Sequence, residues 1–149
     1  MPLERVLQRL DSTHQKLHNA VSPLTAEIYS RQPAEGEWSV GEIVHHVHLV
    51  EERVITELES AATQPLRRVG LLRRLIPTSI VSSRLIRVKS PKAVTPLNAP
   101  AKEVGLENLD RTRSRLKDFC ASHGNERLRN LVFKHPFLGE IDGVATVSF

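Results

Sequence analysis

Cysteine is almost absent from this chain: Cys120 is the single one among 149 residues. One thiol cannot form a disulfide framework or a paired-cysteine zinc motif, so we expect a protein of the reducing cytoplasm. Cys120 follows Phe119 near the end of a predicted helix, and the sequence displays no base beside it. The sequence therefore predicts a small buried thiol rather than a nucleophile.

Long hydrophobic runs are also lacking. Residues 1–6 do not have the apolar core and small-residue cleavage pattern of a signal peptide. The longest uncharged runs, such as residues 75–83, are less than half the length that spans a bilayer. We therefore expect a soluble protein, and the length fits one domain over residues 1–149.

Acidic residues are missing between Glu59 and Glu103, whereas nine arginines and lysines lie in that interval. The basic segment, residues 67–102, could attract the phosphates of a nucleic acid or an anionic membrane surface. However, it contains no aromatic residue for base stacking, and its arginines do not share one helical face. These features favour a solvated crossover over a nucleic-acid or membrane contact.

Apolar residues at helical spacing predict three long helices, over residues 3–20, 40–61 and 102–122. A shorter helix is expected over residues 23–31, capped by Ser22 because Pro23 suits a first helical turn. The third long helix is expected to bury Val104, Leu106, Leu109, Leu116 and Phe119, and to stop at His123-Gly124-Asn125.

The rest of the chain carries weaker patterns. Proline and glycine divide residues 64–89 into one or two short helices, and three prolines predict an extended connection over residues 90–100. Residues 126–149 are expected to be loop-like, and no strand alternation is strong enough to predict a sheet. The expected fold is all-α, an up-down bundle with long crossovers that would ordinarily need a fourth helix to close its core.

The second long helix has the clearest start signal. Ser39 followed three residues later by Glu42 is a capping box, in which each side chain accepts a hydrogen bond from a backbone N–H at the helix start. Its apolar stripe is expected to centre on Val47 and Val54.

Three histidines lie on this helix. At 100° per residue, His45 should project into solvent, while His46 and His48 flank the apolar stripe on opposite sides. A flanking histidine can point into a cleft of a bundle, and neutral imidazole is a common metal ligand. The competing interpretation is a half-buried histidine bonded to a water or to the backbone.

Residues 38–47, WSVGEIVHHV, resemble the second-helix signature of the DinB-like (DinB/YfiT) superfamily. Three further segments agree with it in order and spacing. KSP at residues 89–91, with Pro96, looks like the family's proline-containing crossover. LDRTR at residues 109–113 looks like its arginine-bearing third helix, and HPFLGE at residues 135–140 is similar to the loop before its fourth helix.

This resemblance implies a four-helix bundle in which three histidines hold a divalent metal, often zinc or nickel. One ligand lies on the second helix and maps to His46, whereas the other two lie on the fourth helix as His-x-x-x-His. The chain carries no such pair after Gly139, and residues 143–149 could at most start that helix. The fourth helix is thus expected to be truncated or absent. One histidine cannot hold a catalytic zinc, which normally has three protein ligands.

Three routes to a complete site remain open. His14 and His18 are spaced i, i+4 on the first helix, although a core histidine beside an exposed one gives the same pattern. His48 and Glu51 share a face, but Glu51, if buried, could instead pair with Arg111 or Arg113. A homodimer would cover the exposed groove and could bring two copies of His46 together.

Two functions follow as alternatives. The resemblance implies a metal-dependent hydrolase or thiol transferase, with His46 as the remaining ligand and no other residue assigned to catalysis. The missing ligands and the uncovered groove instead indicate a non-catalytic bundle that acts as an oligomer or as a binding module.

Overall fold

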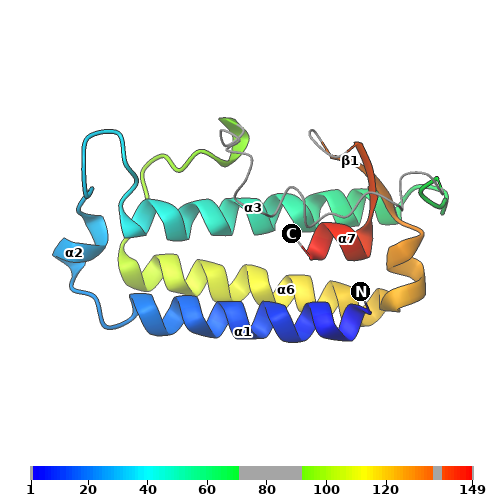
Figure 1. Ribbon diagram of the computed structural model, residues 1–149, viewed down its shortest axis with the longest axis horizontal. Coiled ribbons are helices and arrows are strands. Elements are labelled where there is room, and N and C mark those ends of the chain that lie inside the picture. The colour runs from blue at the N-terminus through cyan, green and yellow to red at the C-terminus, as the bar shows by residue number, and fades with distance from the viewer. Residues whose placement is uncertain (1, 71–91, 136–138, 149) are drawn as a thin grey trace.

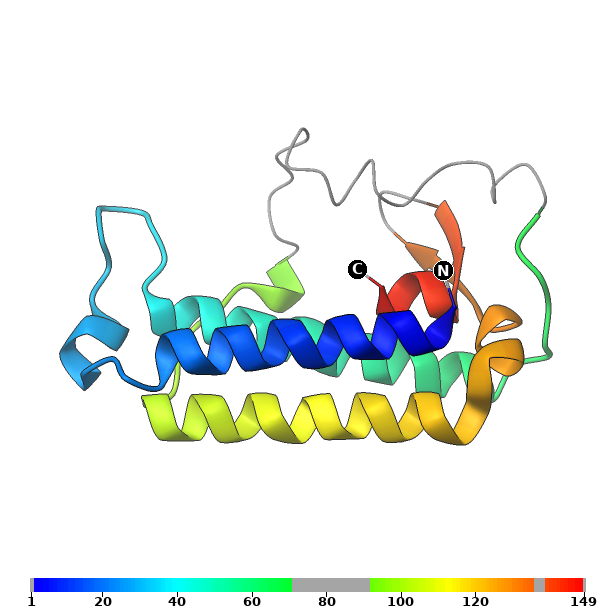
Figure 2. The same cartoon turned by 60° about the horizontal axis from the view of Figure 1, so that its bottom comes forward.

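Three long helices lying side by side form the body of the protein (Figures 1 and 2). The computed structural model describes residues 2–70, 92–135 and 139–148. The long helices are α1 (Leu3–Val21), α3 (Val40–Ala62) and α6 (Lys102–Arg129). The predicted helical bundle is therefore confirmed, and the predicted starts of all three helices agree with the observed ones to within a residue.

Helix α3 begins at the predicted capping box. Ser39 Oγ accepts a hydrogen bond from the Glu42 amide at 3.1 Å, and a Glu42 carboxylate oxygen accepts one from the Ser39 amide at 2.7 Å. The Ser39 amide, and then Gln32, lower the pKa of Glu42 because they bond its charged form. This contribution to stability is therefore present at neutral pH and is lost as the pH falls through the lowered pKa.

The short helix α2 (Ala26–Ser30) starts later than predicted. Its cap is Thr25, whose hydroxyl accepts a hydrogen bond from the Ile28 amide at 3.3 Å, and not Ser22. Ser22 instead keeps a helical conformation and ends α1, with its amide bonded to the His18 carbonyl. The expected cap was therefore wrong, because Ser22 is the C-cap of α1 and has a helical backbone conformation rather than the extended one of an N-cap.

Tyr29 of α2 inserts between α3 and α6 and is buried. A Cβ added to Gly41 would lie 2.7 Å from a ring carbon of Tyr29, and one added to Gly105 would lie 2.5 Å from its hydroxyl oxygen. These two glycines therefore make room for the ring. The buried hydroxyl has no hydrogen-bond partner among the described residues.

Gly124, with φ +69°, breaks α6 at the predicted stop. However, helix resumes beyond it as far as Arg129, so the expected loop over residues 126–149 was wrong. Strands β1 (Val132–His135) and β2 (Gly139–Asp142) follow as an antiparallel pair, in which Phe133 lies opposite Ile141. Both of these side chains are buried in the main core with Leu58, Leu128 and Val144.

Helix α7 (Gly143–Val147) follows β2 directly and is the short helical start that residues 143–149 were expected to allow. Asp142 caps it by accepting a hydrogen bond from the Ala145 amide at 2.8 Å. It contacts α1, α3 and α6 near the hairpin end of the bundle, and its C-terminal end points along the space between α1 and α3 (Figure 1).

The buried face of α3 is rotated from the predicted one. Val44, Glu51, Ile55 and Leu58 are buried on α3, and this face packs against α6. Val47 and Val54, the predicted centre, lie at its edge and are half-buried, and Val50 beyond them is 36% exposed. The predicted centre lies between two apolar faces of α3, because the sequence pattern does not distinguish the face that packs against α6 from the face that stays open.

On α6, Leu106, Leu109 and Leu116 are buried and Phe119 is half-buried, as expected. Val104 is 48% exposed, so its predicted burial was wrong. Cys120 is fully buried, and its burial raises the pKa of the thiol to about 11, as expected for an unreactive cysteine.

The connection between α3 and α6 is described only in part. Residues 65–70 are not helical, and the rest of the helices predicted before residue 90 falls on residues 71–91, outside the described residues. A short 3-10 helix, η1 (Lys92–Val94), interrupts the stretch that was expected to be extended. Arg67 pairs with Glu140 at 2.6 Å, and Lys102 donates to the Leu24 carbonyl at 2.7 Å. These two basic side chains thus serve internal contacts. Among the described helices, none is long and apolar enough to cross a membrane.

We predict that Gly105→Ala lowers the free energy of unfolding by about 1–3 kcal/mol, because the new methyl group overlaps the Tyr29 hydroxyl. In a Tyr29→Phe background the same substitution should be neutral or stabilising by up to about 1 kcal/mol, because the next ring atom is 3.7 Å away and alanine favours helix. Urea denaturation measures both values. Gly70→Ala, with no atom nearby, is the control; an equal loss in both backgrounds would contradict the proposed overlap.

Candidate functional site

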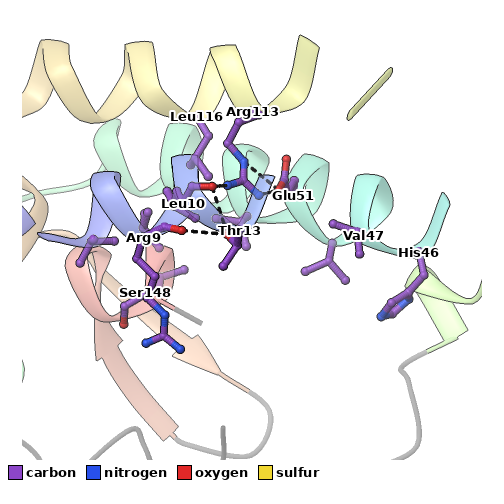
Figure 3. A pocket seen from close by; sticks show the side chains of 14 residues that line it. Arg9, Leu10, Thr13, His46, Val47, Glu51, Arg113, Leu116 and Ser148 are labelled. Carbon is purple, nitrogen blue, oxygen red and sulfur yellow. Dashed lines mark hydrogen bonds and ion pairs between the residues drawn. The ribbon is translucent and has the colours of Figure 1, made fainter. Parts of the chain in front are cut away.

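A cavity of about 370 Å³ lies between α1 and α3, beside the end of α7. Its walls are mostly apolar and include Leu10 from α1, Val47, Val50 and Val54 from α3, and Val147 from α7. This is the open apolar face of α3. Seven polar residues complete the lining: Thr146, and six that Figure 3 labels, Arg9, Thr13, His46, Glu51, Arg113 and Ser148.

An ion pair between Glu51 and Arg113 lies at the middle of the cavity. Arg113 Nε donates to Glu51 Oε1 at 3.0 Å, a terminal guanidinium nitrogen donates to the same oxygen, and the other terminal nitrogen donates to the Leu10 carbonyl. Thr112 Oγ1 donates to Glu51 Oε2 at 3.1 Å. Both side chains are buried. Of the two arginines that the sequence left open as partners of Glu51, the structure therefore selects Arg113, and both carboxylate oxygens are bonded.

His46, the predicted metal ligand, lies at one end of the cavity, and Arg9 and Ser148 lie at the other (Figure 3). His46 Nδ1 is 2.6 Å from the Val94 carbonyl oxygen, and the ring packs against Trp38 with centroids 5.0 Å apart. Because a carbonyl only accepts, Nδ1 carries the proton, and the lone pair of a neutral ring is on Nε2. A histidine that binds a metal through Nε2 adopts this tautomer.

The histidine pair on α1 does not reach this cavity. His14 Nε2 is 2.7 Å from Asp110 Oδ1 of α6, and the His14 and His18 rings have centroids 6.5 Å apart. Neither side chain lines the cavity. The structure thus places this pair on the α6 side of α1, away from His46.

His45 and His48 lie on the other side of α3 from His46. The predicted projection of His45 into solvent was wrong: its side chain is half-buried and its Nδ1 is shielded from solvent. The cause is the rotated core face, which brings His45 closer to α6 than a stripe centred on Val47 would. Burial is the largest cause that lowers the pKa of His48, which favours its neutral form at neutral pH.

The donors at the cavity do not fit a metal held by three histidines. Among the described residues there is no group of three or more His, Cys, Asp or Glu side chains that could hold a metal ion. Glu51 is the one carboxylate in the described lining, and Arg113 and Thr112 already occupy its oxygens. His46 Nε2 is therefore the one free donor of this kind in that lining.

The family model of the DinB superfamily matches residues 9–147. The chain belongs to the DinB superfamily. The match spans nearly the whole length, including most of the cavity lining and the hairpin that precedes α7. Searches of the curated proteins and of the solved structures each returned no match.

Four polar cavity residues of this DinB-superfamily chain escaped the sequence analysis: Arg9, Thr13, Thr146 and Ser148. Arg9 and Thr13 stand next to stripe positions on α1, where the pattern indicates solvent. They line a cavity because no described helix covers this side of the bundle. Ser148 comes directly after α7, in a segment expected to be loop.

We predict that Arg113→Ala lowers the free energy of unfolding by about 3–5 kcal/mol, because it leaves the buried Glu51 carboxylate without its cation. Arg115→Ala is the matched control two residues away. Arg115 pairs with Glu52 and Glu59 at the surface, so its loss should cost about 1 kcal/mol or less. Guanidinium denaturation gives both values. Similar losses for the two variants would show that the buried pair contributes no more to the free energy of unfolding than a surface pair.

Proposed function

We propose that this DinB-superfamily chain is a non-catalytic binding module whose cavity between α1 and α3 takes up a small molecule with an apolar body. The observation that carries the proposal is the cavity itself: about 370 Å³, walled by valine and leucine side chains. Sites for small molecules are typically of about this size, mostly apolar, with a few polar groups that fix orientation.

The hydrogen bonds of Glu51 support the binding of a small molecule rather than metal-dependent catalysis. Arg113 bonds Oε1 of this carboxylate and is 11% exposed, so a metal could bind Oε1 only by displacing Arg113, and at Oε2 it would compete with the Thr112 hydroxyl. Displacement would leave a buried guanidinium without its anion, a change that costs several kcal/mol. The hydrolase or thiol transferase that the family resemblance implies also needs two further ligands beside His46. Metal binding by His46 stays a prediction, and it needs metal ligands that the described cavity lining does not supply.

The homodimer expected from the sequence would use the same surface. Val50 and Ile43, which are 36% and 44% exposed, extend the apolar wall of the cavity along α3. A second copy seated there would compete with a small molecule. The two occupants are separable, because a ligand that displaces a second copy must lower the mass measured by light scattering.

We predict that 1-octanol binds saturably, with a dissociation constant of about 1 mM or below, since burying a CH₂ group contributes about 0.8 kcal/mol before the cost of immobilisation. Val50→Phe should weaken this binding at least about tenfold by filling the cavity. Val104→Phe, an equal change at an exposed position of α6 outside the cavity, should not. Isothermal titration calorimetry measures the three proteins. Absence of saturable heat, or equal binding by both variants, would contradict the proposed function.

We predict that purified protein loaded with excess zinc or nickel and then desalted retains well under one metal per chain, because the described donors are too few. His46→Ala should leave the retained amount unchanged, as should the control His18→Ala on α1. Metal analysis by mass spectrometry decides the matter. One metal per chain that is lost only with His46→Ala would establish the metal-dependent alternative instead.

A further inference from the structure

Arg9 provides a positive charge at the rim of the cavity without a matching negative charge. Its guanidinium makes no hydrogen bond or ion pair with the residues that the structure describes, although it belongs to the cavity lining. Arg113, the other arginine of the lining, is neutralised by Glu51. The described lining therefore carries one uncompensated cation, and the cavity favours a ligand with an anionic group.

The hydroxyl groups near Arg9 do not supply a competing donor. Thr13 Oγ1 donates to the carbonyls of Arg9 and Leu10, at 2.9 and 3.0 Å. Thr146 Oγ1 donates to the Asp142 carbonyl at 2.9 Å, and Ser148 Oγ donates to the Ala145 carbonyl at 2.8 Å. Each hydroxyl has a single proton, so a ligand can only donate to these groups. Within the described lining, Arg9 is therefore the side chain at this end with hydrogen-bond donors free for an anion.

The apolar wall of the cavity extends along α3, away from the end that carries Arg9. Figure 3 shows Arg9 and Ser148 at one end of the cavity and Val47 and His46 at the other, with the Glu51–Arg113 pair between them. Val50 and Val54 continue the wall along α3. A molecule lying along the cavity thus meets a cation at one end and a valine surface along its length.

Resting on the proposed binding function, we propose that the ligand is an amphipathic carboxylate, a single anionic head on an apolar chain, and that Arg9 selects it. The carboxylate lies against the Arg9 guanidinium, where a charge-assisted and often bidentate bond forms. The chain lies along Val54, Val50 and Val47. An amine of the same length is repelled by Arg9, and an alcohol of the same length keeps the apolar contact but loses the charge.

Three probes with the same chain test the selection: octanoate, 1-octanol and octylammonium, titrated at pH 7 into the full chain by calorimetry. We expect octanoate to bind about tenfold more tightly than octanol, and octylammonium to bind more weakly than octanol. The preference for octanoate should shrink as salt is raised, because Arg9 is exposed to solvent.

Arg9→Gln removes the charge and keeps most of the side-chain length. It should lower octanoate affinity about tenfold, to the level of octanol, and leave octanol binding unchanged. Arg5→Gln, one turn earlier on α1 and outside the cavity lining, is the control and should keep the preference. Both positions are exposed, so both variants should fold.

The outcomes separate the two proposals. If octanol and octanoate bind equally well and Arg9→Gln changes neither, the cavity binds apolar chains but the carboxylate assignment is wrong. A preference for octanoate that survives Arg9→Gln would also overturn the role of Arg9. If none of the three probes binds, the proposed function fails, and the selection by Arg9 fails with it.

Discussion

The buried pair of Glu51 and Arg113 joins the three long helices. Its carboxylate belongs to α3, its guanidinium belongs to α6, and the guanidinium also donates to the Leu10 carbonyl of α1. An unpaired charge at this depth would cost several kcal/mol, so these groups restrict how the helices can slide or rotate. The ion pair between Lys117 of α6 and Asp11 of α1 lies at the surface, where screening by water makes it weaker.

The same pair determines what the cavity can hold. Because Arg113 and Thr112 satisfy Glu51, the one carboxylate of the described lining is not free to bind a cation. Arg9 is left as the uncompensated charge, at the end beside Ser148. The sequence signature of the superfamily implies a metal ligand at His46. In this chain, however, the cavity beside His46 is apolar and has a basic rim. The helical architecture is kept, while the chemistry of the described lining favours an anionic amphipath.

Features fixed by neighbours in the chain were predictable from the sequence. The capping box of Ser39 and Glu42 placed the start of α3 correctly, and Gly124 marked the break in α6, because each acts within a few residues. The hairpin was missed since its strands are only four residues long and gain their stability from burying Phe133 and Ile141 in the core.

The candidate site depended more on contacts between distant segments. The partner of Glu51 stayed open between Arg111 and Arg113, because both are on α6 and only the packed structure shows which one faces α3. The carbonyl that holds His46 Nδ1 comes from Val94, 48 residues later in the chain. The face of α3 was misplaced because the apolar pattern does not distinguish a side that packs against α6 from a side that lines a cavity.

Methyl-resolved NMR of the full chain titrated with 1-octanol locates the binding surface directly. We expect the shifts of Val47, Val50 and Val54 to change together and to saturate, while those of Val104, outside the cavity, stay fixed. Saturating shifts confined to other surfaces, with these three valines unmoved, would show that the cavity between α1 and α3 is not the binding site.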